Sequence, residues 1–170
     1  SFDTSFLGST GDTLHQKQFV HEIYQLVDKN VSSKVTVPIL WDKKTNTIVN
    51  NESAEIIRIL NYSFNDISNN HDDYYPANLQ SEIDNINEVI YKNINNGVYK
   101  TGFSKTQSSY EDAAKKLFNS LDMIEDKLQN QMYLVGNVLT EADIRFLPTL
   151  LRFDCVYYLH FKCNFKKISE

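Results

Sequence analysis

The sequence predicts a short α/β segment followed by an all-helical domain. Two runs rich in Val, Ile and Thr, at residues 34–41 and 47–49, are typical of strands, and a polar turn separates them. From residue 78 onward the apolar residues recur at helical spacing, without the alternation of a strand. Residues 63–77 are rich in Asn, Ser and Asp, which is typical of a loop. We therefore expect the chain to contain two parts of different fold, an α/β segment and a helical domain.

A helix is expected before the first strand. Gly8 and Gly11 lie among Ser, Thr and Asp, which indicates a loop at the start of the chain. Thr13 is expected to cap a helix that ends at residues 28–30. The apolar residues of this helix recur at helical spacing and are Phe19, Ile23, Leu26 and Val27.

The first expected strand contains the Val37-Pro38 dipeptide. Because proline has no backbone N–H, it is confined to the edge of a sheet, a bulge or a bend. A peptide bond before proline is also the kind that adopts the cis form, so we expect a candidate cis bond here. The segment therefore offers an exposed extended edge.

Polar residues follow the second expected strand, at residues 50–53. They can cap a helix whose apolar face carries Ile56, Ile57 and Leu60. Free backbone N–H groups at a helix N-terminus attract a carboxylate. An extended edge beside such a terminus suits a short peptide with a carboxylate, and glutathione is a ligand of this kind.

The helical domain from residue 78 onward is expected to contain three helices. The stripe of the first consists of Leu79, Ile83, Ile86, Ile90 and Ile94. A glycine-flanked bend is expected at residues 98–103, and it would leave Tyr99 outside any core stripe. The next helix is expected from Ser108 or Ser109, with a core face of Tyr110, Ala114, Leu117, Leu121, Ile124 and Leu128.

The start of the third helix is marked by the clearest capping pattern in the helical domain. Thr140 and Asp143 have the spacing of a capping box, with Asp in place of Glu. Pro148 lies inside this helix and is expected to kink it. The apolar residues expected on its core face are Ile144, Leu147, Leu150, Leu151 and Val156.

Composition excludes several classes of function. A net charge of −5 and a pI near 5.4 argue against a nucleic-acid surface, which needs clustered Lys and Arg. No apolar stretch approaches the 18 or so residues of a membrane span, so no membrane partner is expected. His160 and Cys163 form the nearest approach to a metal pair, and two ligands do not make a site. We expect no metal.

Two cysteines occur, and this usage fits a reducing, cytoplasmic compartment. Cys155 lies in an apolar helical run and is expected to be a buried small hydrophobe. Cys163 follows Lys162, whose ammonium could lower the pKa of the thiol. For Tyr99, Tyr157 and Tyr158 two interpretations stay open: a core or interface ring, or a phenol directed at a thiolate or a quinone oxygen.

Several sequence motifs of the chain resemble those of the xi-class glutathione transferases known as glutathionyl-hydroquinone reductases. The motifs that carry the resemblance are VPILWDKKTNTIVNNESAEIIRILN, DDYYPANLQSEID, NNGVYKTGF, YLVGNVLTEADIR and LLRFDCVYYLHFKCN. The resemblance implies a partial thioredoxin-like glutathione-binding domain at residues 1–62, a linker at residues 63–77 and a truncated helical C-terminal domain at residues 78–170.

The resemblance also implies site residues. Glutathione, as co-substrate, would be held by the backbone of the first expected strand and at its γ-glutamyl end by Glu52 and Ser53. The residues of that strand edge are Lys34, Val35, Thr36, Val37 and Pro38, with Lys34 where relatives often have Arg. Tyr99 would line the quinone pocket as proton donor or hydrogen-bond partner, and Tyr157 would help to stabilise a cysteine thiolate.

Neither cysteine of the chain matches the family nucleophile, which the resemblance places upstream of residue 1. We therefore expect these 170 residues to be a fragment of a longer homodimeric protein that acts on glutathionyl-quinone substrates. The alternatives are an omega-like transferase acting on dehydroascorbate or mixed disulfides, and a transferase-like domain without catalysis. A cysteine upstream would favour the reductase, and a serine or alanine there would favour the binding domain.

Overall fold

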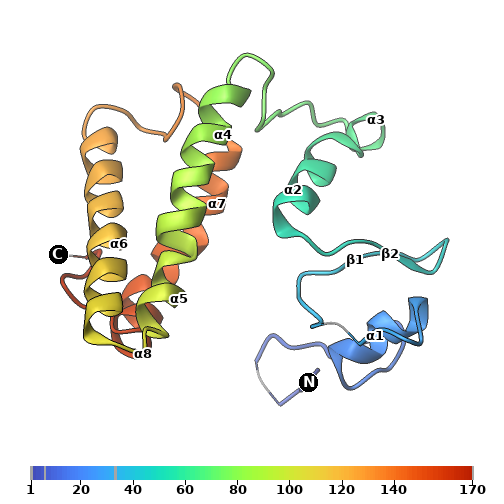
Figure 1. Cartoon of the computed structure of the whole chain (residues 1–170). Coiled ribbons are helices and arrows are strands. Elements are labelled where there is room, and N and C mark those ends of the chain that lie inside the picture. The colour runs from blue at the N-terminus through green and yellow to red at the C-terminus, as the bar shows by residue number, and fades with distance from the viewer. Residues whose placement is uncertain (1, 6, 33, 170) are drawn as a thin grey trace. The chain divides into compact units, whose positions relative to one another are not determined.

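The computed structural model describes residues 2–5, 7–32 and 34–169. The chain divides into two compact units, Ser1–Phe64 and Asn65–Glu170, which we call unit 1 and unit 2 (Figure 1). Each unit is described by itself. The hydrophobic core lies in unit 2, whereas Ile23 and Ile56 are the buried apolar residues among the described part of unit 1.

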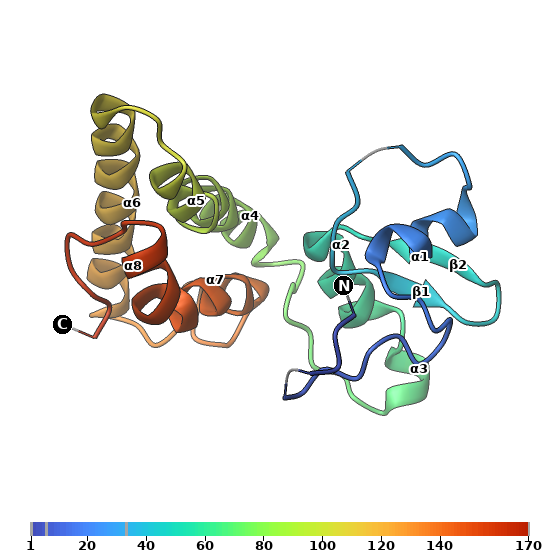
Figure 2. The same cartoon turned by 90° about the horizontal axis from the view of Figure 1, so that it is seen from below.

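Unit 1 consists of two helices and a two-stranded antiparallel sheet (Figure 2). Its elements are α1 (Val20–Val27), β1 (Leu40–Asp42), β2 (Thr47–Asn50) and α2 (Ser53–Tyr62). Trp41 pairs with Ile48, and the register shifts between Leu40 and Trp41. The order helix, strand, strand, helix agrees with the sequence pattern.

Helix α1 begins later than Thr13, so the expected cap is wrong. Asp12 instead holds a turn, because its carboxylate accepts hydrogen bonds from the backbone N–H groups of Leu14, His15 and Lys17. The helix starts at Val20, where Glu22 accepts from the N–H of Phe19 at 2.9 Å and from that of Gln18 at 3.0 Å. A carboxylate in the first turn thus accepts from the N–H groups at the start of the helix, six residues after the expected cap.

Residues 34–39 lie outside both strands, so the expected first strand is wrong over most of its length. The Val37-Pro38 peptide bond is cis, which confirms the candidate cis bond. Proline offers no N–H to a sheet, and the strand begins two residues after it, at Leu40. The second strand is confirmed and extends to Asn50.

The elements of unit 2 are helices, and its described residues form no strand. Its elements are α3 (Asn65–Ser68), α4 (Gln80–Val89), the π-helical η1 (Ile90–Asn95), α5 (Gly97–Gly102), α6 (Gln107–Leu128), α7 (Glu141–Arg152), the π-helical η2 (Phe153–Tyr157) and α8 (Tyr158–His160). Helix α3 falls within the segment expected to be a loop. Helix α6 begins one or two residues before the expected start, after Thr106 as its N-cap.

The bend expected at residues 98–103 is wrong, because these residues continue the helical path of α4 and η1 into α5 (Figure 1). Asn95 supports this continuity from its side chain. Its Oδ1 accepts from the Thr149 hydroxyl at 2.9 Å, and its Nδ2 donates to the Arg145 carbonyl at 3.3 Å. Asn95 therefore joins η1 to α7 just before the expected bend.

The face that helix α7 buries agrees only in part with the expected one: Leu150, and Val156 in η2, pack against the core, whereas Ile144 is exposed. Its buried residues are Glu141, Ala142, Phe146 and Thr149, whereas Leu147 and Leu151 are 50% and 70% exposed. The buried face includes charged Glu141, which accepts from the Nδ2 of Asn87 at 3.0 Å and from Arg145 at 3.1 Å. A buried carboxylate with such partners can occupy a core position, and a search for apolar residues alone misses it.

The capping box of α7 is confirmed. The Asp143 carboxylate accepts from the Thr140 N–H at 2.9 Å and from the Thr140 hydroxyl at 3.2 Å. It also accepts from the Leu134 N–H at 2.8 Å, which ties the preceding turn to the helix. One carboxylate therefore fixes both the start of α7 and the chain that leads into it, and the helix continues past Pro148 to Arg152.

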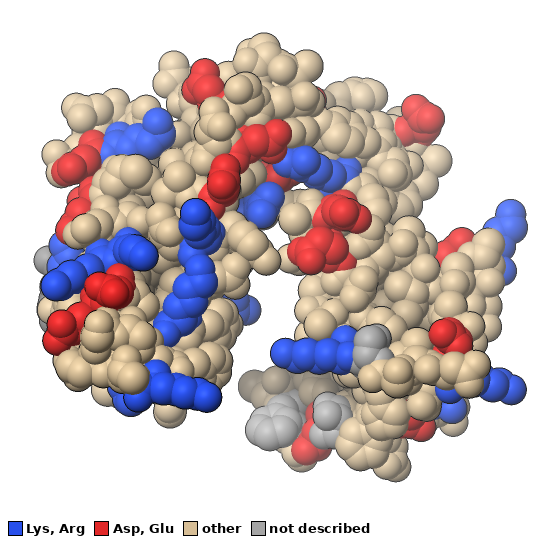
Figure 3. Space-filling model, viewed as in Figure 1, with Lys and Arg blue, Asp and Glu red and all other residues tan. Residues whose placement is uncertain are grey.

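Acidic and basic side chains are interspersed on the visible face of the chain (Figure 3). Among the helices formed by the described residues, none is both long enough and apolar enough to cross a bilayer.

Replacing Asp143 with alanine is expected to lower the free energy of unfolding of unit 2 by about 2 kcal/mol. The substitution removes a helix cap and the acceptor of the buried Leu134 N–H. Urea unfolding followed by circular dichroism measures the change. Asp112→Ala, on the exposed face of α6, is the matched control and is expected to leave the midpoint unchanged. Equal midpoints for both variants would contradict the role given to Asp143.

Candidate functional site

The first group of candidate site residues lies in unit 1, before β1. Lys34, Thr36 and Pro38 are exposed, and Val37 is 68% exposed. Val35 is half-buried. Because residues 34–38 form no strand, their backbone groups are not paired in a sheet, and the Thr36 carbonyl is taken instead by the Tyr24 hydroxyl.

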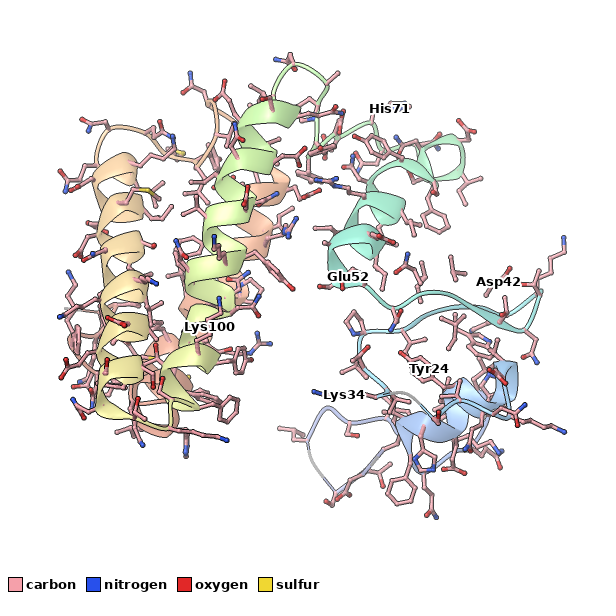
Figure 4. The ribbon with its side chains drawn as sticks, viewed as in Figure 1. Tyr24, Lys34, Asp42, Glu52, His71 and Lys100 are labelled. Atoms are coloured by element: carbon pink, nitrogen blue, oxygen red, sulfur yellow. The ribbon has the colours of Figure 1, made fainter. Side chains whose placement is uncertain are left out.

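The second group lies at the start of α2. Glu52 is the N-cap, and the side chain of Asn50 accepts from its N–H at 2.7 Å (Figure 4). The Glu52 carboxylate lies 3.4 Å from the Ala54 nitrogen and 3.5 Å from the Ser53 hydroxyl. These are long contacts, so the carboxylate has acceptor capacity left for an ammonium group. The helix N-terminus beside it favours an anion.

Asn51 joins these two groups. Its Nδ2 donates to the Thr36 hydroxyl at 2.9 Å, so the segment before Pro38 lies beside the residue that precedes Glu52. A ligand with an extended backbone and an amino-acid end can therefore contact both groups within unit 1. The sequence pattern included Asn51 as a helix cap and did not predict this contact.

The third group is a tyrosine pair in unit 2. The hydroxyl oxygens of Tyr99 and Tyr157 lie 3.2 Å apart, and their rings meet edge to face with centroids 5.7 Å apart. Tyr99 is 42% exposed, whereas Tyr157 is 4% exposed. Burial, followed by the hydrogen bond with Tyr99, raises the pKa of Tyr157 to about 12. At neutral pH Tyr157 therefore keeps its O–H group and can donate a hydrogen bond.

Tyr99 lies on helix α5, so its expected place in a bend is wrong. Its ring packs edge to face on Phe161 at 5.2 Å and stacks on Phe103 at 6.4 Å. A Cβ atom at Gly102 would lie 2.9 Å from the Phe161 Cα, so this glycine permits the approach of α5 to the chain after α8. The packing therefore fixes the Tyr99 ring beside Tyr157.

A surface hollow of about 520 Å³ lies beside Tyr99. It is lined by Asn96, Tyr99, Lys100, Phe103, Ser104, Ser109 and Ala113. The mixture of aromatic rings with a lysine and hydroxyl groups is suited to a flat aromatic ligand that carries oxygen atoms.

Both expectations for the cysteines are wrong. Cys155 is exposed, because it lies on the outer face of η2 rather than in the core. Cys163 is completely buried, and burial raises the pKa of its thiol to about 12 despite Lys162 beside it in sequence. The Cys163 sulfur lies 3.8 Å from the Val98 carbonyl. The Cys163 thiol therefore lacks the lowered pKa of an activated nucleophile.

Metal ligation has no support in the part of the chain that the structure describes. Over residues 2–5, 7–32 and 34–169, no three His, Cys, Asp or Glu side chains are grouped so that they could hold an ion.

Comparison with known proteins identifies the family. Residues 89–169 match the family model "Glutathione S-transferase, C-terminal domain". The whole chain is 52% identical to the glutathionyl-hydroquinone reductase YqjG of Escherichia coli. The chain belongs to the glutathione transferase family. Within this family, it is also 48% identical over 159 residues to the glutathionyl-hydroquinone reductase PcpF of Sphingobium chlorophenolicum, with 94% of the chain covered.

Solved structures agree with this assignment. The glutathione-bound structure of YqjG matches 99% of the chain with a TM-score of 0.96 and 53% identity, and 55% of that chain is covered. Glutathione transferase Xi 1 from Trametes versicolor matches 98% of the chain with a TM-score of 0.93 and 50% identity, and 58% of that chain is covered. The expected fold class, a partial thioredoxin-like domain followed by a helical transferase domain, is confirmed.

The chain spans about half the length of the curated relatives it matches, 52% of YqjG and 51% of PcpF.

The two thiols are expected to react at very different rates. In the folded chain at pH 8, Cys155 should react rapidly with Ellman's reagent because it is exposed, and Cys163 should not, because it is buried and protonated. Addition of urea should release a second equivalent. Cys155→Ser should abolish the rapid phase and leave the urea-dependent one. A rapid phase of two equivalents without urea would contradict the burial of Cys163.

Stability is expected to fall at high pH through the buried phenol of Tyr157. Because its pKa rises from 10.0 to about 12 on folding, its contribution is complete below pH 10 and is lost as the pH rises through 12. Thermal unfolding at pH 8 to 11 should therefore show a smaller loss of stability above pH 10 for Tyr157→Phe than for the parent chain. Tyr91→Phe, at an exposed position, is the control. Parallel profiles for the parent chain and Tyr157→Phe would contradict the raised pKa.

Proposed function

We propose that this chain is part of a glutathione-dependent thiol reductase that converts glutathionyl-hydroquinones to hydroquinones. The observation that carries the proposal is the match of the whole chain, at 53% identity and a TM-score of 0.96, to a glutathione-bound relative. The protein with 52% identity over 170 residues is named a glutathionyl-hydroquinone reductase. The geometry of unit 1 and the tyrosine pair of unit 2 supports this function.

Glutathione is proposed to bind to unit 1. The backbone of residues 34–37, ending at Pro38, would hold its peptide groups. At the other end of the ligand, the Glu52 carboxylate would accept from the γ-glutamyl ammonium. Ser53 and the N-terminus of α2 would bind the γ-glutamyl carboxylate. Asn51 supports this division of roles, because it brings the two segments together through Thr36.

The reaction is proposed to begin with attack of a cysteine thiolate on the glutathionyl sulfur. The new S–S bond forms as the bond between sulfur and the hydroquinone ring breaks, and a proton is delivered to the ring carbon. The cysteine sulfur is oxidised and the ring is reduced. A second glutathione thiolate then attacks the mixed disulfide, which releases oxidised glutathione and restores the cysteine.

The tyrosine pair is proposed to serve the hydroquinone. Tyr99 would donate a hydrogen bond or a proton to a ring oxygen, because its hydroxyl is partly exposed and its neighbour stays neutral. Tyr157 is held 3.2 Å from that hydroxyl and would orient it, and it would help to stabilise the thiolate. The hollow beside Tyr99 would receive the aromatic ring.

The attacking thiolate is proposed to come from residues outside these 170. Cys163 is buried with a raised pKa, and Cys155 lies 3.6 Å from the carbonyl of Leu151, which offers no positive charge to stabilise a thiolate. We further propose a cytoplasmic homodimer, with domains at residues 1–62 and 78–170 joined by residues 63–77.

Calorimetric titration of the chain with glutathione tests the proposed binding site. The parent chain should bind glutathione, and the double variant Glu52→Ala, Ser53→Ala should bind at least about tenfold more weakly, because a charge-assisted contact is lost. Ser108→Ala, Glu111→Ala, near the start of α6, is the matched control and should bind like the parent.

Activity of the longer protein distinguishes the proposed reaction from its alternatives. Release of a hydroquinone from its glutathionyl conjugate supports the reductase, whereas reduction of dehydroascorbate alone would favour an omega-like transferase. Glutathione binding without either activity would favour a binding domain. A folded parent chain that does not bind glutathione would contradict the proposed site in unit 1.

A further inference from the structure

Three side chains of unit 1 form a closed hydrogen-bonded network around the segment before Pro38. The Tyr24 hydroxyl, on α1, donates to the backbone carbonyl of Thr36 at 2.9 Å. The Asn51 Nδ2 donates to the Tyr24 hydroxyl at 2.9 Å and to the Thr36 hydroxyl at 2.9 Å. The network therefore joins three parts of unit 1 that are far apart in sequence.

The Tyr24 hydroxyl and the Asn51 amide each make two hydrogen bonds in this network. The Tyr24 hydroxyl is a donor to one partner and an acceptor from the other, and both N–H bonds of the Asn51 amide have an acceptor. Phenylalanine at position 24 would remove two of the three contacts by deleting one atom. Asn51→Ala would remove a different two, its contacts with the hydroxyls of Tyr24 and Thr36.

The segment held by this network has little other support. Residues 34–39 lie outside both strands, and Thr36 and Val37 are exposed. Its position therefore depends on contacts from side chains rather than on a ladder of backbone hydrogen bonds. Figure 4 labels Tyr24 on α1 and Glu52 at the start of α2, and Asn51 directly precedes Glu52.

We propose that Tyr24 and Asn51 are positioning residues for the glutathione site. They hold the backbone of residues 36–38 at a fixed distance from Glu52 and Ser53, so that one ligand reaches both. This role rests on the proposed glutathione-binding function. Neither side chain needs to touch the ligand, because both act through Thr36 and through the start of α2.

The test compares Tyr24→Phe, Asn51→Ala and their double variant with the parent chain in two measurements. Hydrogen exchange of the free chain, read by mass spectrometry, should show faster exchange in peptides covering residues 34–40 for all three variants. Exchange in α6 should be unchanged. Calorimetry should show glutathione binding about three- to tenfold weaker for each single variant, because roughly two hydrogen bonds are lost.

A merely structural role would lower the melting temperature without a local signature. We therefore expect melting temperatures close to that of the parent chain, together with a change in exchange confined to residues 34–40. The affinity of the double variant for glutathione should be about the same as that of the single variant with the lower affinity, because the two residues act as one unit. Tyr91→Phe, at an exposed position of unit 2, should change neither measurement.

The two readouts separate the inference from the function on which it rests. If the folded parent chain does not bind glutathione, the proposed function fails, and exchange in residues 34–40 still decides whether the network holds that segment. If the parent binds and the variants bind equally well with unchanged exchange, the positioning role is overturned. Faster exchange with unchanged affinity would also overturn it, because the segment would then be held without consequence for the ligand.

Discussion

The candidate site of unit 1 depends on the fixed position of one irregular segment, residues 34–39. Residues 34–39 form no strand, and a peptide of this kind samples many conformations unless other groups hold it. Here the Asn51 amide and the Tyr24 hydroxyl satisfy polar atoms of Thr36. The same Asn51 lies next to the N-cap of α2, so the two halves of the proposed site share one support.

In unit 2 the packing of helices holds the tyrosine pair in place. The path from α4 through η1 to α5 is continuous, and Gly102 lets the chain after α8 approach closely enough for Phe161 to pack on Tyr99. The backbone carbonyl of Tyr157 also accepts from the N–H groups of Phe161 and Cys163. The tyrosine pair is therefore held by packing and backbone contacts, whereas the segment of unit 1 is held by side chains.

Local patterns predicted the features that depend on neighbouring residues. The capping box of α7, the cis bond before Pro38 and the order of elements in unit 1 followed from short stretches of sequence. The contact between Asn51 and Tyr24 joins residues 27 positions apart, and no periodicity indicates it. The motif resemblance, rather than spacing, named Tyr99 and Tyr157 together.

The errors in the sequence predictions have common physical causes. The glycines that flank residues 98–101 suggested a bend, yet the Asn95 side chain has partners on α7 and the helix continues. The charged Glu141 was not expected in a core, yet Asn87 and Arg145 satisfy it. Cys155 lies among apolar residues in sequence but on the exposed face of its helix. In each case a tertiary contact or the orientation of a helix decided the outcome.

The most direct test of the central claim is a map of glutathione contacts by nuclear magnetic resonance on the isotope-labelled chain. The account predicts that titration with glutathione shifts the backbone amide signals of Val37 and Ser53 together, with one dissociation constant, and leaves the signals of α6 unchanged. Shifts confined to unit 2, or shifts of the two amides with different dissociation constants, would contradict a single glutathione site built from residues 34–38 and the start of α2.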